Sequence, residues 1–138
     1  MKHRGSINQF NIERDRELLV LYRQARATAK YPTTMYELCE RTSKLPASCH
    51  YISDFYAYLY IRRRMAGERK HFKRREQRIL YESLYDIVVG LMKKEKYRNY
   101  ALARLVDIAL AMPAPCIGLS PRTIQDKLCV VFSKKKKK

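Results

Sequence analysis

Apolar residues recur at helical spacing along most of the chain. In residues 12–29 the apolar side chains stand three or four positions apart, at Leu18, Leu21, Tyr22 and Ala25. Charged residues fill many of the positions between them, which is the pattern of an amphipathic helix with one buried face. The chain contains only 4 glycines and few β-branched runs. We therefore predict an all-α fold.

Cap and stop signals predict a second helix. Thr34 and Glu37 have the spacing of a capping box, in which the hydroxyl and the carboxylate each satisfy a free backbone donor. The helix should run from there to about Lys44, because Pro46 cannot continue it. Its inward positions should be Met35, Leu38 and Cys39.

A third helix follows an irregular segment. Ser53 is a suitable N-cap, because its hydroxyl can accept a hydrogen bond from a backbone amide of the first turn. The helix should extend over roughly 54–70, with Ala57 and Ile61 facing the core.

The same pattern returns 67 residues further along the chain. Residues 45–49 (Leu-Pro-Ala-Ser-Cys) match residues 112–116 (Met-Pro-Ala-Pro-Cys), and Ile52-Ser53 match Leu119-Ser120. The corresponding apolar positions of the second half are Tyr85, Val88, Val89, Met92, Leu102, Leu105, Val106, Ile124 and Leu128. We interpret this as a tandem duplication of one three-helix unit. The alternative is two unrelated helical segments that share a common helix stop.

The repeat divides the chain into four parts. These are a first three-helix unit at 1–61, a basic connecting segment at 62–78, a second three-helix unit at 79–128 and a basic tail at 129–138, whose lysine run from Lys134 to Lys138 should be disordered. Two helices that meet across a turn, supported by a third, form a helix-turn-helix-like arrangement.

Charge is the strongest indication of function. The 138 residues include 30 Lys and Arg but only 13 Asp and Glu, a net charge of +17. Such an excess favours a polyanionic partner, because each neutralised phosphate releases condensed counterions. A merely soluble basic surface is the alternative. The expected phosphate contacts of the connecting segment are Arg62, Arg63, Arg64, Arg69, Lys70, Lys73, Arg74, Arg75 and Arg78, which only Glu68 and Glu76 offset.

Aromatic residues precede this segment, at Phe55, Tyr56, Tyr58 and Tyr60. Tyrosines beside arginines can stack on bases while the guanidinium groups bind phosphates. The alternative is that the rings pack between the two units, and this is the expectation for Phe55 and Tyr56.

Residues 118–128 (Gly-Leu-Ser-Pro-Arg-Thr-Ile-Gln-Asp-Lys-Leu) form a local motif. Ser120 should cap a helix, Pro121 suits its first position, and Ile124 and Leu128 should point inward. The motif resembles the recognition helix of LuxR-type helix-turn-helix activators, although residues 112–115 replace the short turn of those families. The resemblance implies that DNA would be contacted by Arg122, Thr123, Gln125 and Lys127.

A second resemblance involves residues 46–53 (Pro-Ala-Ser-Cys-His-Tyr-Ile-Ser). This segment is similar to a Pro-Ala-x-x-x-aromatic-x-Ser segment of small basic helical proteins from phages and mobile elements. The resemblance implies a genomic setting rather than a mechanism.

The sequence contains no motif that is typical of an enzyme. It contains no carboxylate cluster, Gly-rich phosphate loop, H-E-x-x-H or G-x-S-x-G, so we expect neither catalysis nor a cofactor. Cys49-His50 lacks a second pair at zinc-finger spacing, so we expect no metal, and the four cysteines are interpreted as buried, small apolar thiols. No membrane span or secretory signal is expected, which favours a cytoplasmic protein, with the nucleoid or a virion as alternatives.

We therefore expect a protein that binds nucleic acid, with duplex DNA favoured over RNA, and that regulates or organises DNA in a phage or mobile element. Affinity would come from residues 62–78 and the lysine tail, and sequence preference from Arg122, Thr123 and Gln125. The alternative is a basic accessory or structural subunit with a protein partner, such as an RNA binder associated with a polymerase or reverse transcriptase, a virion component or a ribosome-associated protein.

Overall fold

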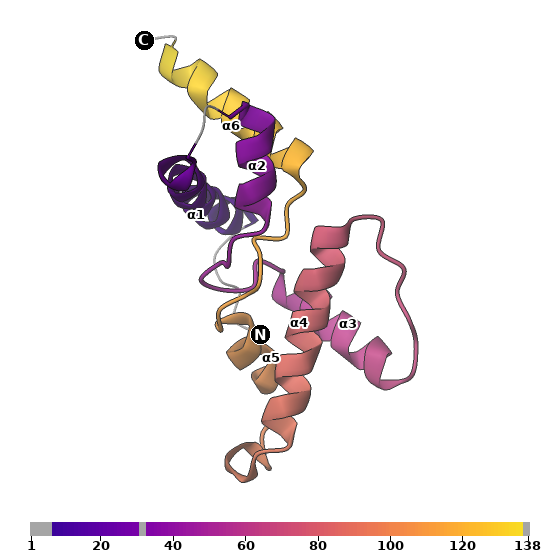
Figure 1. The fold of residues 1–138 in the computed structure, drawn as a ribbon. Coiled ribbons are helices and arrows are strands. Elements are labelled where there is room, and N and C mark those ends of the chain that lie inside the picture. Colours follow the sequence, from indigo (N-terminus) through magenta and orange to yellow (C-terminus); the bar gives the residue numbers. More distant parts are fainter. Residues whose placement is uncertain (1–6, 31–32, 137–138) are drawn as a thin grey trace. The chain divides into compact units, whose positions relative to one another are not determined.

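The computed structural model describes residues 7–30 and 33–136, which are all-α, as predicted (Figure 1). The elements are α1 (Ile7–Thr28), α2 (Met35–Ser43), α3 (Asp54–Met65), α4 (Arg75–Met92), the 3-10 helix η1 (Glu95–Tyr97), α5 (Leu102–Leu110) and α6 (Pro121–Lys136). Within the described ranges, β-type pairing is limited to one isolated bridge. No helix of this part of the chain is long and apolar enough to cross a membrane.

The helices form two compact units whose composition differs from the expected one. Unit 1 contains α1, α2 and α6, and unit 2 contains α3, α4, η1 and α5. In unit 1, α2 packs on both α1 and α6, whereas in unit 2, α5 packs on α4 and α3. The expected divisions at 1–61 and 79–128 group the helices differently, because in the structure α3 packs with α4 and α5, and α6 packs with α2. Apolar periodicity fixes which face of a helix is buried but not which helix covers it.

The core of unit 1 contains the predicted stripe of α1. Leu18, Leu21, Tyr22 and Ala25 are all buried. This core is completed by Leu38 and Cys39 of α2, by Ile124 and Leu128 of α6, and by Leu119, which lies just before α6. Thr34 caps α2 by accepting a hydrogen bond from the amide of Glu37, as predicted, whereas Met35 is only half-buried.

Unit 2 is built around α4, whose buried face differs from the expected one. The buried residues of α4 are Leu80, Leu84, Val88 and Leu91. Tyr85 and Val89 are half-buried, and Met92 is 49% exposed. The prediction is therefore confirmed for Val88 and not for the other three positions, because the constant offset of 67 residues does not reproduce the buried face of this helix. From α3, Ala57 and Ile61 are fully buried, as predicted, and Leu105 and Val106 of α5 are also buried.

Two irregular segments of unit 2, one around Ala47 and one around Ala114, pair with each other although they are distant in the sequence; we call them the crossing segments. The backbone amides and carbonyls of Ala47 and Ala114 exchange two hydrogen bonds of 3.0 Å, which form the isolated antiparallel bridge. His50 adds a hydrogen bond from its amide to the carbonyl oxygen of Leu110. Both alanines belong to the Pro-Ala pairs that the sequence singled out, so the irregular segments pair with each other.

Three element ends differ from the expectation. Helix α3 ends at Met65 instead of continuing to residue 70, and α4 begins at Arg75 instead of 79. At the carboxyl end, α6 continues to Lys136, so the expected tail from residue 129 is helical over the described residues. The expectation of disorder at Lys134–Lys138 is wrong for 134–136, while 137–138 lie outside the described residues.

Candidate nucleic-acid interface

The predicted basic stretch forms the end of α3, a loop at 66–74 and the start of α4. Gly67, with φ of 91°, ends α3 in a Schellman motif: its amide donates to the carbonyl of Arg64, and the amide of Glu68 donates to that of Arg63. A positive φ suits glycine because it has no Cβ. This turn is the reason why the helix stops early and the basic residues continue as a loop.

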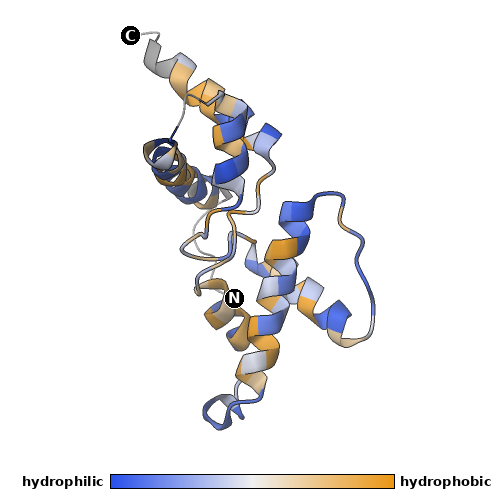
Figure 2. Ribbon diagram, in the orientation of Figure 1, coloured by the Kyte–Doolittle hydropathy of each residue, from blue (hydrophilic) through white to orange (hydrophobic). Residues whose placement is uncertain are grey.

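The basic residues of this stretch reach solvent. All nine except Arg64, which is half-buried, have exposed side chains. Hydrophilic positions predominate from the end of α3 through the loop to the start of α4 (Figure 2). The ion pairs of Asp15, Glu95 and Asp126 lie elsewhere in the chain. The stretch therefore presents a concentrated positive surface on unit 2.

Positive charge at the start of α4 is unfavourable for the helix itself. Arg74 occupies the N-cap position without a side-chain cap hydrogen bond, and Arg75 and Arg78 stand in or beside the first turn. Cations near a helix amino terminus oppose the helix dipole, by typically 0.3–1 kcal/mol each. The dipole of α4 therefore does not favour arginines at these positions.

An aromatic cluster lies beside the basic residues. The ring centroids of Tyr60 and Tyr81 are 4.9 Å apart in an edge-to-face arrangement, and Phe72 lies 5.8 Å from Tyr60 and 5.1 Å from Tyr81. Burial raises the pKa of the Tyr81 hydroxyl, as do the neighbouring hydroxyls of Tyr56 and Tyr60. The cluster thus holds the basic loop against α3 and α4 through Phe72.

Two of the predicted cations are engaged by this cluster. Arg64 donates a hydrogen bond of 3.0 Å from Nη1 to the hydroxyl of Tyr60, and its guanidinium carbon lies 4.5 Å from the ring centroid of Tyr85. The Nζ atom of Lys70 lies 5.4 Å from the centroid of Phe72 and 5.9 Å from that of Tyr81. Arg64 therefore supports the fold of the site, while Lys70 is exposed and stays available at its edge.

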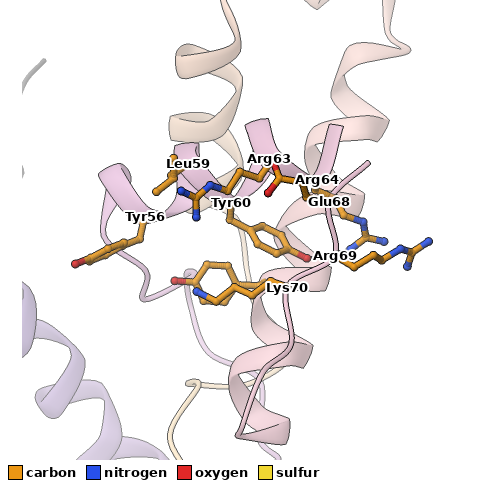
Figure 3. A pocket seen from close by; sticks show the side chains of 9 residues that line it. Tyr56, Leu59, Tyr60, Arg63, Arg64, Glu68, Arg69 and Lys70 are labelled. Carbon is orange, nitrogen blue, oxygen red and sulfur yellow. Dashed lines mark hydrogen bonds between the residues drawn. The ribbon is translucent and has the colours of Figure 1, made fainter. Parts of the chain in front are cut away.

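A pocket of about 280 Å³ opens between α3, the loop and α4. Its lining comprises Tyr56, Leu59, Tyr60, Arg63, Arg64, Glu68, Arg69, Lys70 and Tyr81. Figure 3 shows Tyr60 at its centre, with Tyr56 on one side and Arg69 on the other. The structure thus brings together Arg63, Arg64, Arg69 and Lys70 of the predicted residues.

Sequence reasoning missed two members of this site, Phe72 and Tyr81. Phe72 stands between His71 and Lys73 in an otherwise basic loop, and such an isolated aromatic residue was a usable signal. Tyr81 gave none, because it stands among the apolar residues of an amphipathic helix. Phe55 and Tyr56, which were expected to pack between units, are 62% and 61% exposed, and their rings contact each other edge to face.

The second predicted set of binding residues lies on α6, in unit 1. Ser120 caps this helix by accepting a hydrogen bond from the amide of Thr123, and the two hydroxyls lie 2.9 Å apart. Arg122 is 81% exposed, with its Nε 3.8 Å from a carboxylate oxygen of Asp126. Lys127 is half-buried and forms an ion pair of 3.6 Å with Asp15 of α1.

Of these four residues, Arg122 is therefore the most accessible, because Thr123 and Gln125 are half-buried and Lys127 is tied to α1.

Of the four cysteines, Cys39 and Cys116 are buried as expected, whereas Cys49 is half-buried and Cys129 is exposed. His50 is buried, and its ring atoms contact the carbonyl oxygen of Met112 and the hydroxyl of Ser83. Across the described residues, no three His, Cys, Asp or Glu side chains gather in a way that could hold a metal ion.

Comparison of the chain with models of known protein families, with curated proteins and with solved structures gave no match.

Proposed function

We propose that this protein binds nucleic acid, with DNA as the favoured class, and that it regulates or organises the DNA of a phage or mobile element. The observation that carries the proposal is the exposed basic surface of unit 2, which extends from Arg62 through the 66–74 loop to Arg78. Arginine and lysine side chains in this surface would neutralise phosphates, a contact that provides affinity without sequence selection.

Sequence preference would come from α6. Its first turn presents Arg122 to solvent, and Gln125 stands one turn further along the same helix. Arginine pairs with guanine and glutamine with adenine in a major groove. The arrangement of Ser120 cap, Pro121 and buried Ile124 is compatible with a recognition helix, in line with the local resemblance to LuxR-type activators.

The proposal includes a duplication of one helix-turn-helix-like unit. It is supported by helices α2 and α5: the first residue of α5 lies 67 positions after the first residue of α2, and the same is true of their last residues. The N-caps Ser53 and Ser120 are separated by the same offset. The reciprocal hydrogen bonds between Ala47 and Ala114 also join equivalent positions. In such a duplicated protein, the third helix of each copy would pack with the first two helices of the other.

A second candidate is a basic accessory subunit that binds single-stranded nucleic acid or RNA. The exposure of Phe55 and Tyr56 favours it, because accessible aromatic rings beside arginines can stack on unpaired bases. Binding to duplex DNA, single-stranded DNA and structured RNA under identical salt would decide between the two candidates.

The test of phosphate binding is a salt series. Fluorescence anisotropy with a labelled DNA duplex should show affinity falling steeply with salt, with a log-log slope of about 0.9 for each neutralised phosphate. The double variant R75A/R78A removes two exposed arginines from the surface and should lower that slope by about 2.

The matched control is R16A/R23A, which removes the same charge from exposed positions of α1. We expect its slope to stay closer to that of the unmodified protein. Equal effects of the two double variants would show that total charge, not this surface, binds the DNA. A slope near zero for the unmodified protein would refute the proposal altogether.

A further inference from the structure

The pocket of unit 2 combines two kinds of surface. Tyrosine side chains form one part of its lining, where Tyr60 is buried, Tyr81 is half-buried and Tyr56 is exposed. Cationic side chains of Arg63, Arg69 and Lys70 form another part. We infer that this pocket takes one unpaired nucleotide, with its base against the exposed ring of Tyr56 and its phosphate at the cationic side chains. The inference rests on the proposed function and specifies which part of the nucleic acid this site binds.

The aromatic lining distinguishes a nucleotide from a bare phosphate. Tyr60 and Tyr81 meet edge to face at 4.9 Å, and the exposed ring of Tyr56 lies at the side of the pocket (Figure 3). Phosphate binding requires only donors and positive charge. Aromatic rings add stacking on a planar base, which every base allows and which gives affinity without a fixed sequence.

The size of the pocket limits the ligand to a single base. Its volume of about 280 Å³ lies just below the range of about 300–1,000 Å³ that is common for ligand pockets. A duplex cannot enter such a space, and a paired base would first have to leave the helix at a cost in stacking and pairing. A base that is already unpaired avoids this cost, so single strands, gaps and overhangs are the favoured ligands.

The charges of the lining also suit a nucleotide. Arg64 is engaged by the hydroxyl of Tyr60 and the ring of Tyr85, which leaves Arg63, Arg69 and Lys70 for the phosphate. Glu68 is the one carboxylate of this lining, and it can accept a hydrogen bond from an amino group of a base. The remaining arginines of the stretch would contact the flanking phosphates.

The experiment compares a blunt DNA duplex with the same duplex carrying a short single-stranded overhang that contains 2-aminopurine. The intact protein should bind the overhang duplex about tenfold more tightly than the blunt one, which corresponds to one stacked base. Fluorescence of 2-aminopurine reports stacking separately from affinity, and we expect it to fall on binding.

Two neighbouring residues provide matched variants. Tyr56 and Phe55 are equally exposed, yet only Tyr56 lines the pocket. Tyr56→Ala should abolish most of the preference for the overhang and restore the 2-aminopurine signal, while Tyr56→Phe should retain both because the ring remains. Phe55→Ala should leave the preference within about twofold of the unmodified protein, since it removes no stacking surface of the pocket.

The outcomes separate this inference from the proposed function. Equal binding of blunt and overhang duplexes, or equal losses in Tyr56→Ala and Phe55→Ala, would overturn the pocket inference and leave phosphate binding intact. No binding of either duplex at low salt would overturn both. Adenosine monophosphate should bind at least about 100-fold more weakly than the overhang duplex, because it lacks flanking phosphates. Equal affinity would overturn the inference by assigning the pocket to a free nucleotide.

Discussion

His50 donates a hydrogen bond of 3.0 Å from Nδ1 to the carbonyl oxygen of Met112. A carbonyl oxygen can only accept, so the proton of the neutral ring is on Nδ1. Nε2 is then an acceptor, and it lies 3.0 Å from the hydroxyl of Ser83, which can donate to it. Both ring nitrogens of the buried imidazole thus have a hydrogen-bond partner in the neutral form. These bonds join the segment around His50 to α4, through Ser83, and to Met112 just after α5.

This arrangement predicts a loss of stability in mild acid. Burial lowers the pKa of His50 below its usual value of 6.5, an effect that the hydrogen bond to Met112 partly offsets. The pKa of His50 is lower in the folded protein than in the unfolded chain. Packing of the neutral ring therefore contributes fully to stability above about pH 6.5, and this contribution is lost as the pH falls below that value, because the unfolded chain binds the proton first. We expect the free energy of unfolding to be lower at pH 5.5 than at pH 7.5, because the unfolded chain takes up a proton at this position over that range and the folded protein takes up less.

Urea unfolding at the two pH values checks this prediction, with His50→Gln as the control. Glutamine can donate to Met112 and accept from Ser83, but it does not titrate. The variant should therefore show a nearly constant stability over this range. The same pH dependence in His50→Gln would assign the effect to other groups.

Two glycines of the described residues have a positive φ, and they predict different costs of substitution. Gly67 (φ 91°) has open space around an added Cβ, whereas at Gly118 (φ 83°) a Cβ would lie 2.6 Å from Cδ2 of the buried Leu80. Gly67→Ala should cost about 1–2 kcal/mol, because only the backbone conformation is strained. Gly118→Ala should cost about 3 kcal/mol, because overpacking adds to that strain. Urea unfolding of both variants is the measurement, and equal losses would contradict the steric argument.

Local features of this fold could be predicted from the sequence. Thr34, Ser53 and Ser120 each accept the cap hydrogen bond that their positions indicated, because a cap depends on residues three positions apart. The buried face of α1 followed from periodicity for the same reason. The end of α3 just before Gly67 was harder to predict from the sequence. A lone glycine within a basic run ends a helix only if it adopts a positive φ, and the sequence does not show its φ.

The pattern of apolar residues could not predict which helices pack together. The apolar faces of α3 and α6 are similar, with Ala57 and Ile61 in one helix and Ile124 and Leu128 in the other. Either helix would therefore satisfy the apolar period of either unit. The choice depends on the path of the crossing segments, where Ala47 pairs with Ala114, and neither residue indicates that pairing by itself.

The sequence predicted the charged residues of the candidate site but not the pocket that they line. Composition alone located the exposed arginines and lysines of 62–78. The pocket depends on Tyr60, Phe72 and Tyr81, which come from three different elements and meet only through tertiary packing. Arg64 was counted among the phosphate contacts, although its hydrogen bond to Tyr60 gives it a structural role.

The last prediction separates base recognition from core packing on α6. Arg122 is 81% exposed and pairs only weakly with the equally solvated Asp126, whereas Ile124 is fully buried. Arg122→Ala should change the free energy of unfolding by less than about 0.5 kcal/mol, because exposed ion pairs contribute little. Ile124→Ala should cost about 2–5 kcal/mol, because it leaves a cavity in the core of unit 1.

Binding selections from random duplexes measure the other half of this prediction. If Arg122 pairs with a base edge, Arg122→Ala should relax the preference at one position of the selected site by about 1–3 kcal/mol while the salt dependence changes little. Arg122→Lys is the control, because lysine retains a charge for phosphate but lacks the planar fork of the guanidinium group. Full rescue by lysine, or a selection that yields no base preference, would exclude recognition by α6 and leave the basic surface of unit 2 as the binding site.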